Sequence, residues 1–266
     1  FGEGMRRTFG GLFSKKGEAG ADGMSSFQAL ATAIAAQVGT GNIAGAATAL
    51  AIGGPGAIFW MWIAAFLGMA TIYAEAIMAQ KYKTVGADGQ VTGGPVYYIR
   101  AAFKGTFGKV LAGIFAILIT LALGFMGNAV QSNSIAASFH TAFGIPQWIM
   151  GLVVAVIAIF VFMGGMKRIA KVTETIVPFM AALYIIGSLI VIIYNYKNIP
   201  YAFASIFIGA FSPSSVVGGA AGATVKLALT KGVARGLFSN EAGMGSTPHA
   251  HAVAKVDHPV EQGFVA

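Results

Sequence analysis

The stretch A-Q-V-G-T-G-N-I-A-G at residues 36–45 interrupts an apolar segment with glycines, a glutamine, a threonine and an asparagine. Glycine weakens a helix, and asparagine competes for the backbone hydrogen bonds that hold it together. Inside a bilayer, the carbonyls freed by such a break can coordinate Na⁺, and the freed amides can hold a carboxylate. A packing seam is the alternative, because Gly41 and Gly45 form a G-x-x-x-G motif. A seam does not need polar neighbours, so the stretch favours a ligand site.

A second polar stretch, G-F-M-G-N-A-V-Q-S-N-S at 124–134, follows a long apolar run. Gln131 and Ser132 follow Asn128 by three and four positions along a helix, so the three residues share one face. Buried amides there could contact an amino or carboxylate group of a substrate. The stretch could equally be a helix end that reaches the lipid headgroups, and the residues alone leave both interpretations open.

A third stretch, G-V-A-R-G-L-F-S-N-E-A-G-M-G-S-T-P-H-A-H-A at 232–252, is again rich in glycine and polar residues. Arg235 and Glu241 are unfavourable inside a bilayer unless they pair or face water. An ordinary polar loop is the alternative. The position of the stretch in the second half of the chain favours a second broken helix, and paired broken helices indicate a transporter site.

The remaining ionisable candidates are weaker indications of a functional site. His249 and His251 are two positions apart, so on a helix they diverge, and without a nearby carboxylate they do not predict a metal site. They are expected at the cytoplasmic end of the third stretch. Glu75 and Glu174 flank apolar segments and are expected to be interfacial or salt-bridged, with a role in proton coupling less favoured.

The elements that must position these residues are membrane helices. Only 10% of the 266 residues are charged and 56% are hydrophobic, whereas soluble domains carry about 25% charged residues. No charged residue occurs in 23–74, 110–166 or 175–196. Because a bilayer span needs about 20 apolar residues, these gaps hold two, two and one spans. The chain has no cysteine, which excludes disulfides and thiolate metal sites.

The sequence therefore predicts an all-α polytopic membrane protein. Residues 1–26 form a basic cytoplasmic or interfacial segment, with a helix expected in the first 22 residues, and residues 27–266 form a transmembrane core. The expected spans are 27–52, 56–79, 108–135, 147–166 and 173–195, followed by an interrupted sixth segment at 217–252.

Basic residues alternate between successive connections, with four before the first span, none after it, then five, none, three and one. The positive-inside rule places the N-terminal segment in the cytoplasm, and odd-numbered spans run outward. The net charge of +8 thus reflects loops rather than nucleic-acid binding. Phe59, Trp60 and Trp62 would form an interfacial belt near the outer face, and G-G-P-V-Y-Y at 93–98 would begin a short cytoplasmic helix.

Four motifs together resemble the alanine or glycine:cation symporter family, also called sodium:alanine symporters. They are G-T-G-N-I-A-G-A-A-T-A-L-A-I-G-G-P-G-A-I-F-W-M-W, G-G-P-V-Y-Y-I, V-Q-S-N-S-I and G-V-A-R-G-L-F-S-N-E-A-G-M-G-S, and they occur in the family's order. The resemblance implies a leucine-transporter-type fold of two inverted repeats. It also implies Na⁺-driven uptake of small neutral amino acids, mainly alanine and glycine, across a bacterial or archaeal inner membrane by alternating access.

The resemblance also implies roles for residues at both interruptions. Thr40 and Gly41 would meet the substrate's carboxylate, and carbonyls near Ala35 and Val38 would help to bind Na⁺, the coupling ion. No cofactor is implied. The segment at 217–252 would be the symmetry mate of the first span. The other implied substrate contacts are Asn42, which would steady the break or touch substrate, Gln131, Ser239, Asn240 and Gly243.

Family members are longer, so the chain is expected to hold the first repeat and the beginning of the second. Helices beyond it would complete the cation site, and the 266 residues alone are not expected to transport. The alternative hypothesis is a passive channel or another solute carrier with similar broken helices. A membrane enzyme is disfavoured, because no aspartate lies within a span and the histidines gather at one end.

Overall fold

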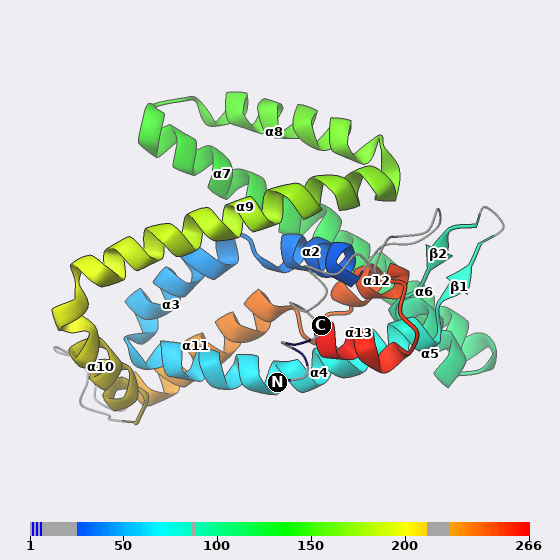
Figure 1. Cartoon of the computed structure of the whole chain (residues 1–266), viewed down its shortest axis with the longest axis horizontal. Helices are drawn as coiled ribbons and strands as arrows, with labels where there is room; N and C mark the ends of the chain where they lie inside the picture. The colour runs from blue at the N-terminus through cyan, green and yellow to red at the C-terminus, as the bar shows by residue number, and fades with distance from the viewer. Residues whose placement is uncertain (1, 3, 5, 7–25, 87–88, 212–223) are drawn as a thin grey trace. The chain divides into compact units, whose positions relative to one another are not determined.

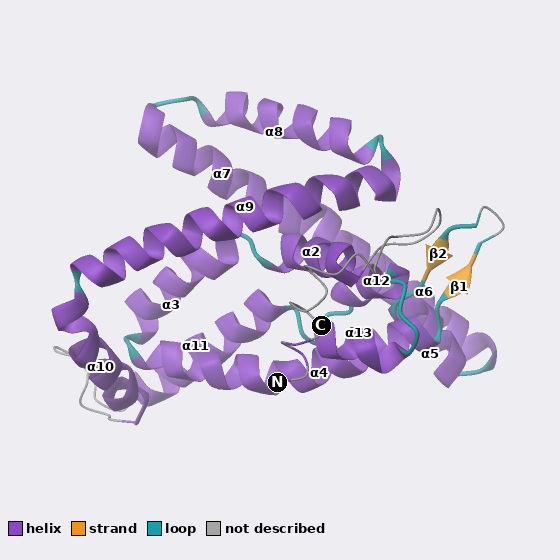
Figure 2. Cartoon of the chain, viewed as in Figure 1, coloured by secondary structure: helices purple, strands orange, loops and turns teal. Residues whose placement is uncertain are grey.

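The computed structural model describes residues 2, 4, 6, 26–86, 89–211 and 224–266, and these are almost entirely helical (Figures 1 and 2). The two-stranded antiparallel hairpin of β1 and β2, which pairs Thr84 with Thr92, was not expected. The elements are α2 (Ser26–Gln37), η1 (Gly41–Gly45), α3 (Ala46–Gly53), α4 (Gly56–Lys81), β1 (Thr84–Val85), β2 (Val91–Thr92), α5 (Pro95–Ala102), α6 (Gly105–Leu121), η2 (Ala122–Gly127), α7 (Asn128–Phe143), α8 (Gln147–Phe162), α9 (Gly165–Tyr194), η3 (Tyr196–Asn198), α10 (Ile199–Phe211), α11 (Thr224–Asn240), α12 (Thr247–Val253) and α13 (Pro259–Val265).

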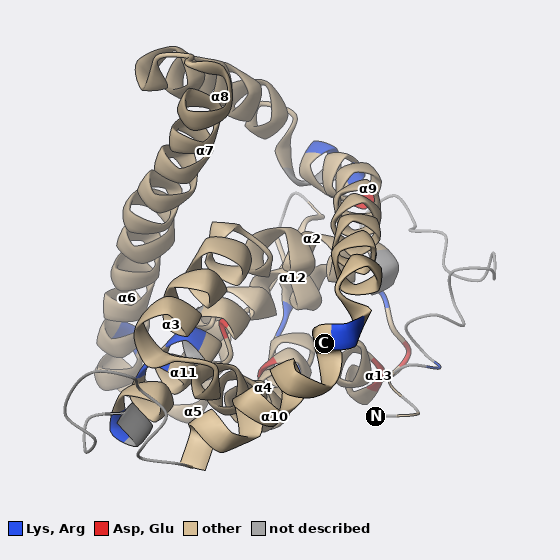
Figure 3. Cartoon of the chain, turned by 90° about the vertical axis from the view of Figure 1, so that its left-hand side faces the viewer, with Lys and Arg blue, Asp and Glu red and all other residues tan. Residues whose placement is uncertain are grey.

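Three helices of the described chain are long and apolar enough to cross a membrane, at Gly56–Lys81, Gly105–Phe143 and Arg168–Tyr194. They correspond to three expected spans, and the expected span at 147–166 is the shorter apolar helix α8. Helices α7 and α8 carry no Lys, Arg, Asp or Glu, so Figure 3 draws them entirely in tan. The chain is thus an all-α, multi-pass membrane protein.

The other two expected spans are interrupted. The first divides into α2, then η1 and α3, and the sixth segment divides into α11 and α12. The start of that sixth segment, at 217–223, lies outside the described residues, and so does nearly all of the basic segment 1–26 with its expected helix. The expected cytoplasmic helix is α5, which begins at Pro95 where a missing amide costs nothing.

Local chemistry ends the helices where the chain reverses. Helix α7 ends at Gly144, whose φ of 70° lets its amide donate to the carbonyl of His140 at 2.8 Å. Pro146 then precedes α8, where its fixed φ and lack of an amide suit a helix start. The result is a hairpin of α7 packed on α8.

The chain forms two compact units that alternate along the sequence. Unit 1 comprises Phe1–Ala36, Ile72–Ile176 and Gly243–Ala266, and unit 2 comprises Gln37–Thr71 and Val177–Ala242. Helices α4 and α9 each contribute residues to both units.

Within unit 2, α11 runs antiparallel to η1 and α3. A Cβ on Gly53 would lie 3.4 Å from Cα of Ala228, and a Cβ on Gly45 would lie 2.6 Å from Cζ of Arg235. Residues further along α11 therefore contact residues earlier in α3 and η1. Opposite chain directions match the alternation expected for an outward first segment and an inward sixth one.

Helix α11 packs on the first part of α4 through a seam of small residues in unit 2. A Cβ on Gly232 would overlap the carbonyl of Ala57, and one on Gly236 would lie 2.7 Å from Cβ of Ala64. The glycines let the two helices, which run parallel, approach closely. The G-x-x-x-G motif that forms this seam is thus Gly232-x-x-x-Gly236.

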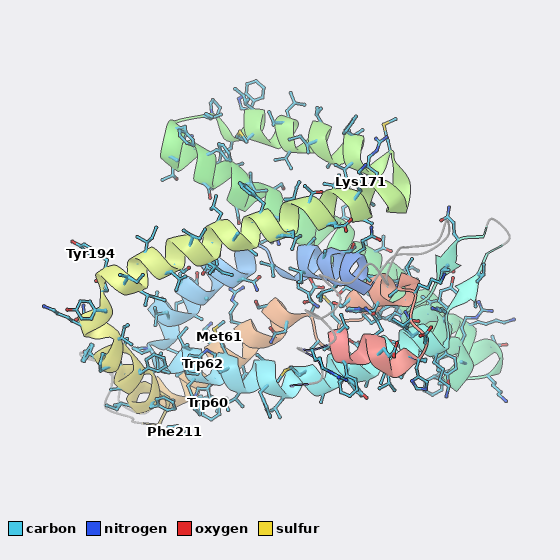
Figure 4. All side chains as sticks on the ribbon, in the orientation of Figure 1. Trp60, Met61, Trp62, Lys171, Tyr194 and Phe211 are labelled. Atoms are coloured by element: carbon cyan, nitrogen blue, oxygen red, sulfur yellow. The ribbon has the colours of Figure 1, made fainter. Side chains whose placement is uncertain are left out.

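An aromatic cluster marks one end of unit 2. Phe59 stacks edge-on against Phe207 and Phe211 of α10, and Nε1 of Trp60 donates to the carbonyl of Ala210 at 3.4 Å. Figure 4 shows Trp60, Trp62 and Phe211 at this end of α4. Aromatic rings that carry a polar atom suit a membrane interface, in line with the expected outer belt.

Candidate functional site

The first interruption is stabilised by one of its own side chains. Helix α2 ends at Gln37, residues 38 and 39 bend, and a π-helical turn begins at Gly41. The amide of Gly39 donates to Oδ1 of Asn42 at 3.0 Å, and the amide of Asn42 donates to the carbonyl of Gly39 at 3.1 Å. Asn42 therefore supplies the acceptor that a continuous helix would have supplied, so irregular backbone is satisfied here.

This exchange removes the usual hydrogen-bond donor from one carbonyl of α2. In an α-helix, the amide of Gly39 would donate to the carbonyl of Ala35, four residues earlier. Because that amide donates to Asn42 instead, the carbonyl of Ala35 loses its helical donor. Ala35 is exposed, Val38 is 40% exposed, and Thr40, Gly41 and Asn42 are half-buried.

A guanidinium lies beside this turn in unit 2. Gly45, the last residue of η1, is buried, and the space that its side chain would fill is occupied by the guanidinium of Arg235. Arg235 comes from α11, 190 positions along the sequence. The sequence indicated that this arginine must pair or face water, but it did not reveal the neighbouring glycine.

The second interruption separates α11 from α12 with a turn at 241–246. Its backbone enters the left-handed region at Glu241 (φ 53°), Gly243 (φ 87°) and Gly245 (φ 83°). Ser239, one turn beyond Arg235 on α11, is buried, and Asn240 is half-buried. The interpretation of this stretch as an ordinary loop is therefore wrong, because helices flank the turn on both sides.

Helix α11, which precedes the second interruption, lies alongside the first within unit 2. Their antiparallel register pairs Gly53 with Ala228 and Gly45 with Arg235. Helix α11 contacts η1 directly. Of the other expected site residues, Ala35, Gln131 and Gly243 belong to unit 1.

Glu75 holds the second interruption in unit 1. Its side chain is 7% exposed, and Oε2 accepts a hydrogen bond of 3.2 Å from the amide of Gly243, while the amide of Gly245 also faces the carboxylate. Burial, and to a smaller degree the charge of Glu75, raises the pKa of the nearby Tyr98 hydroxyl well above its usual range. The partners that the structure gives Glu75 are backbone amides rather than the cation of the expected salt bridge, and its interfacial position stays a prediction.

Glu174 is also held by an uncharged partner. Its Oε2 accepts a hydrogen bond of 3.0 Å from Nε2 of Gln28, and the hydroxyls of Thr32 and Thr173 lie 3.2 Å apart. These two contacts join α2, the half-helix before the first interruption, to α9 within unit 1. A side-chain amide thus takes the place of the expected salt-bridge partner, and the interfacial position of Glu174 stays a prediction.

A buried polar cluster anchors the other end of α12 to α4. Nε2 of Gln80 donates to the carbonyls of His251, Ala252 (3.3 Å) and Ala254 (2.8 Å). Nζ of Lys83 donates to Oε1 of Gln80 at 2.6 Å and to the carbonyl of Ala254 at 3.2 Å. These donors add hydrogen bonds to carbonyls at the end of α12, where helical donors run out. Burial lowers the pKa of Lys83.

The two histidines of α12 diverge as their spacing predicts. His251 is 1% exposed, and its Nδ1 lies 2.6 Å from Nε2 of Gln262. His249 is exposed, and its Nδ1 lies 3.1 Å from the carbonyl of Ser246.

The polar stretch at 124–134 is not a helix end. A π-helical turn, η2, joins α6 to α7 within the continuous helix Gly105–Phe143, so the stretch lies well inside that helix. Nδ2 of Asn128 donates to the carbonyl of Gly124 at 3.1 Å, and Oγ of Ser132 donates to the carbonyl of Asn128 at 2.8 Å. Gln131 is half-buried on the same helix. The interpretation of this stretch as a helix end is therefore wrong.

Comparison with known proteins identifies one family. The model of the sodium:alanine symporter family matches residues 2–266. The sodium/alanine symporter AgcS of Methanococcus maripaludis is 48% identical over 256 residues, which cover 96% of this chain and 56% of that protein.

Two Bacillus subtilis proteins carry provisional names. YrbD, named as a sodium/proton-dependent alanine carrier protein, is 49% identical over 94% of this chain and 50% of its own length. GlnT, named as a sodium/glutamine symporter, is 46% identical over 91% of this chain and 49% of its own length. The chain thus spans about half the length of these relatives.

Proposed function

This chain belongs to the sodium:alanine symporter family, and we propose that the protein carries small neutral amino acids, alanine or glycine, into a prokaryotic cell together with Na⁺. The names of AgcS and YrbD support Na⁺ and alanine. That the named relatives are bacterial or archaeal supports an inner-membrane location.

One observation carries the proposal. Two segments that adjoin interruptions, η1–α3 and α11, lie antiparallel and in contact within unit 2, with Arg235 beside Gly45. Paired broken helices of opposite direction are what an inverted repeat produces, and transporters bind their cargo at such breaks. We therefore favour the leucine-transporter-type fold, with residues 27–266 as part of its core, and alternating access as its mechanism.

The proposed cation site uses backbone oxygen. Na⁺ prefers oxygen ligands, and the carbonyl of Ala35 is deprived of its helical donor because Gly39 bonds to Asn42. Together with the carbonyl of Val38 it would supply part of the ligand set. Asn42 would then act as a positioning residue, since its side chain holds the amide of Gly39 that would otherwise bond to the carbonyl of Ala35.

The proposed substrate site uses the opposite end of the break. The first amides of a half-helix attract a carboxylate through the helix dipole, so Thr40 and Gly41 would bind the carboxylate of the amino acid. The further contacts proposed are Asn42, Gln131, Ser239, Asn240 and Gly243. Small residues around the break favour a small side chain on steric grounds.

The direct test is uptake of labelled alanine by the full-length protein in liposomes. With an inward Na⁺ gradient, alanine should accumulate above its external concentration; with choline in place of Na⁺, and with or without an inward proton gradient, it should not. Equal uptake without Na⁺ would reject cation coupling, and equilibration without accumulation would favour a passive channel.

Competition distinguishes the substrate class. Unlabelled glycine should inhibit alanine uptake, whereas glutamine, the substrate in the name of GlnT, should inhibit less because its side chain is longer. Stronger inhibition by glutamine than by glycine would contradict a pocket for small side chains.

A further inference from the structure

A groove of about 430 Å³ lies between α5 and α6 in unit 1, outside the proposed transport site. Its lining consists of Val96, Arg100, Lys109, Ala112, Gly113 and Ala116. Two long cationic side chains thus border a floor of small apolar residues, which is an amphipathic arrangement.

The two cationic side chains of this groove are free to bind an anion. Arg100 and Lys109 are both exposed, and within the described residues neither forms an ion pair. A site with two cations and no acidic partner complements an anion.

The floor of the groove has room for an apolar chain. Ala112 is buried, and a Cβ added to Gly113 would meet no atom within 4 Å. Ala116 lies one turn beyond Ala112 on α6, so small residues continue along the helix axis. They leave a furrow that leads from the cationic end into the apolar part of the span Gly105–Phe143.

The position along the chain places this groove at a membrane surface. Helix α6 begins the span, whereas α5 precedes it in the most basic connection of the chain, which the positive-inside rule assigns to the cytoplasm. Phe103 and Phe107 lie where α5 meets α6, and their ring centroids are 5.6 Å apart. Both side chains are exposed, which suits aromatic residues at the level of the lipid headgroups.

The connection between α5 and α6, which forms one end of the groove, is closely packed. Gly108 is buried without a side chain, and a Cβ there would overlap the carbonyl of Phe103. The amide of Phe103 donates to the carbonyl of Ile99 at 2.9 Å. These contacts fix α5 against the start of α6, so a ligand would find the groove already formed.

We propose that this groove binds an anionic phospholipid of the cytoplasmic leaflet. Its phosphate lies between Arg100 and Lys109, and one acyl chain follows Ala112, Gly113 and Ala116. Basic clusters beside membrane helices on the cytoplasmic side recognise anionic headgroups, with each cation contributing to the attraction.

The test measures lipid binding by the full-length protein after delipidation in detergent, with phosphatidylglycerol and phosphatidylcholine as probes in native mass spectrometry. Phosphatidylglycerol should bind more tightly. In the double variant R100Q/K109Q its affinity should fall roughly 30-fold, whereas K81Q, which removes another exposed cation, should leave it unchanged. Equal binding of the two lipids, or an unaltered affinity in the double variant, overturns the proposal.

A second variant tests the furrow without changing charge. Gly113→Leu should fill it and weaken phosphatidylglycerol binding, whereas Gly151→Leu on α8, where a Cβ also meets nothing within 4 Å, should not. Unchanged binding in G113L, or displacement of the lipid by millimolar inorganic phosphate, would show a simple anion site and reject a lipid site. Because the measurement does not involve transport, its result tests the lipid site independently of the proposed function.

Discussion

The carboxylate of Glu75 accepts a hydrogen bond of 3.2 Å from the amide of Gly243, so a residue of a membrane helix holds the turn between α11 and α12. Hydrogen bonds to a charged group contribute about 1.5–3 kcal/mol. This contact joins the turn to α4 within unit 1.

Glu75→Ala should loosen the turn. We expect the reactivity of a cysteine introduced at Met244 to rise roughly tenfold, because the loss of about 1.5 kcal/mol shifts the turn toward open states by that factor. Glu75→Gln, which retains an acceptor oxygen without the charge, should show a smaller rise. The rate of maleimide labelling in membranes measures the effect.

Glu174→Gln provides the matched control, because this carboxylate bonds to Gln28 rather than to the turn. Labelling that is equally fast in the parent protein and in E75A would mean that Glu75 does not hold the turn.

Asn42→Ala should weaken Na⁺ binding more than it weakens folding. The variant removes the acceptor for the Gly39 amide, which costs about 1 kcal/mol in comparable capping positions, and the carbonyl of Ala35 can then regain its helical donor. The Na⁺ concentration for half-maximal alanine uptake should rise several-fold, while Asn42→Asp, which keeps Oδ1, should retain the bend. Asn198→Ala, at an exposed position of η3, is the control; the same Na⁺ dependence in all variants would remove Asn42 from the site.

Gly232→Ala should destabilise the protein much more than Gly45→Ala. The new methyl at 232 would overlap the backbone carbonyl of Ala57, which cannot move without shifting α4, and overpacking of this kind costs about 1–3 kcal/mol. At Gly45 the obstacle is the mobile end of Arg235, which can shift. Thermal unfolding in detergent measures both.

Gly187→Ala, on α9 where a Cβ meets nothing within 4 Å, should be neutral or stabilising, since alanine favours helix by about 1 kcal/mol. A lower melting temperature for G45A than for G232A would contradict the seam between α11 and α4.

Gln80→Ala should detach the end of α12 from α4. It removes the Nε2 donor from the carbonyls of His251, Ala252 and Ala254, although those of His251 and Ala254 keep bonds from the Ala254 amide and from Nζ of Lys83. Each lost hydrogen bond costs about 0.5–1.5 kcal/mol. We expect faster hydrogen exchange in α12 than in the parent. Gln147→Ala, at the exposed start of α8, should leave that exchange unchanged, and protection retained in Q80A would refute the anchoring role.

Sequence patterns predicted the membrane helices and both interruptions because these depend on neighbouring residues. Charge-free runs such as 23–74 predict the spans, and Gly39, Gly41 and Asn42 together predict a break. The bend nevertheless begins at Val38 and continues as a π-helical turn, a detail that depends on which acceptor the Gly39 amide finds.

Partners far apart in the sequence were not predictable. Glu75 and Gly243 are 168 positions apart, and Gln28 and Glu174 are 146 apart. A carboxylate near a span end indicates an interface or an ion pair by composition alone. Only the fold shows that backbone amides and a glutamine side chain take that place.

The chain crosses between its two units at four points, and three of them coincide with gaps in the helical ladder. The crossing after Ala36 adjoins the bend at Val38 and Gly39, the crossing after Ala242 falls inside the turn 241–246, and the crossing after Ile176 lies two residues before Pro178. A backbone that lacks these hydrogen bonds flexes at lower cost than an intact helix. The glycines, the asparagine and the proline therefore weaken the backbone hydrogen bonding near three crossings; α9 nevertheless continues through Pro178 as one helix, and α4 crosses without any such residue.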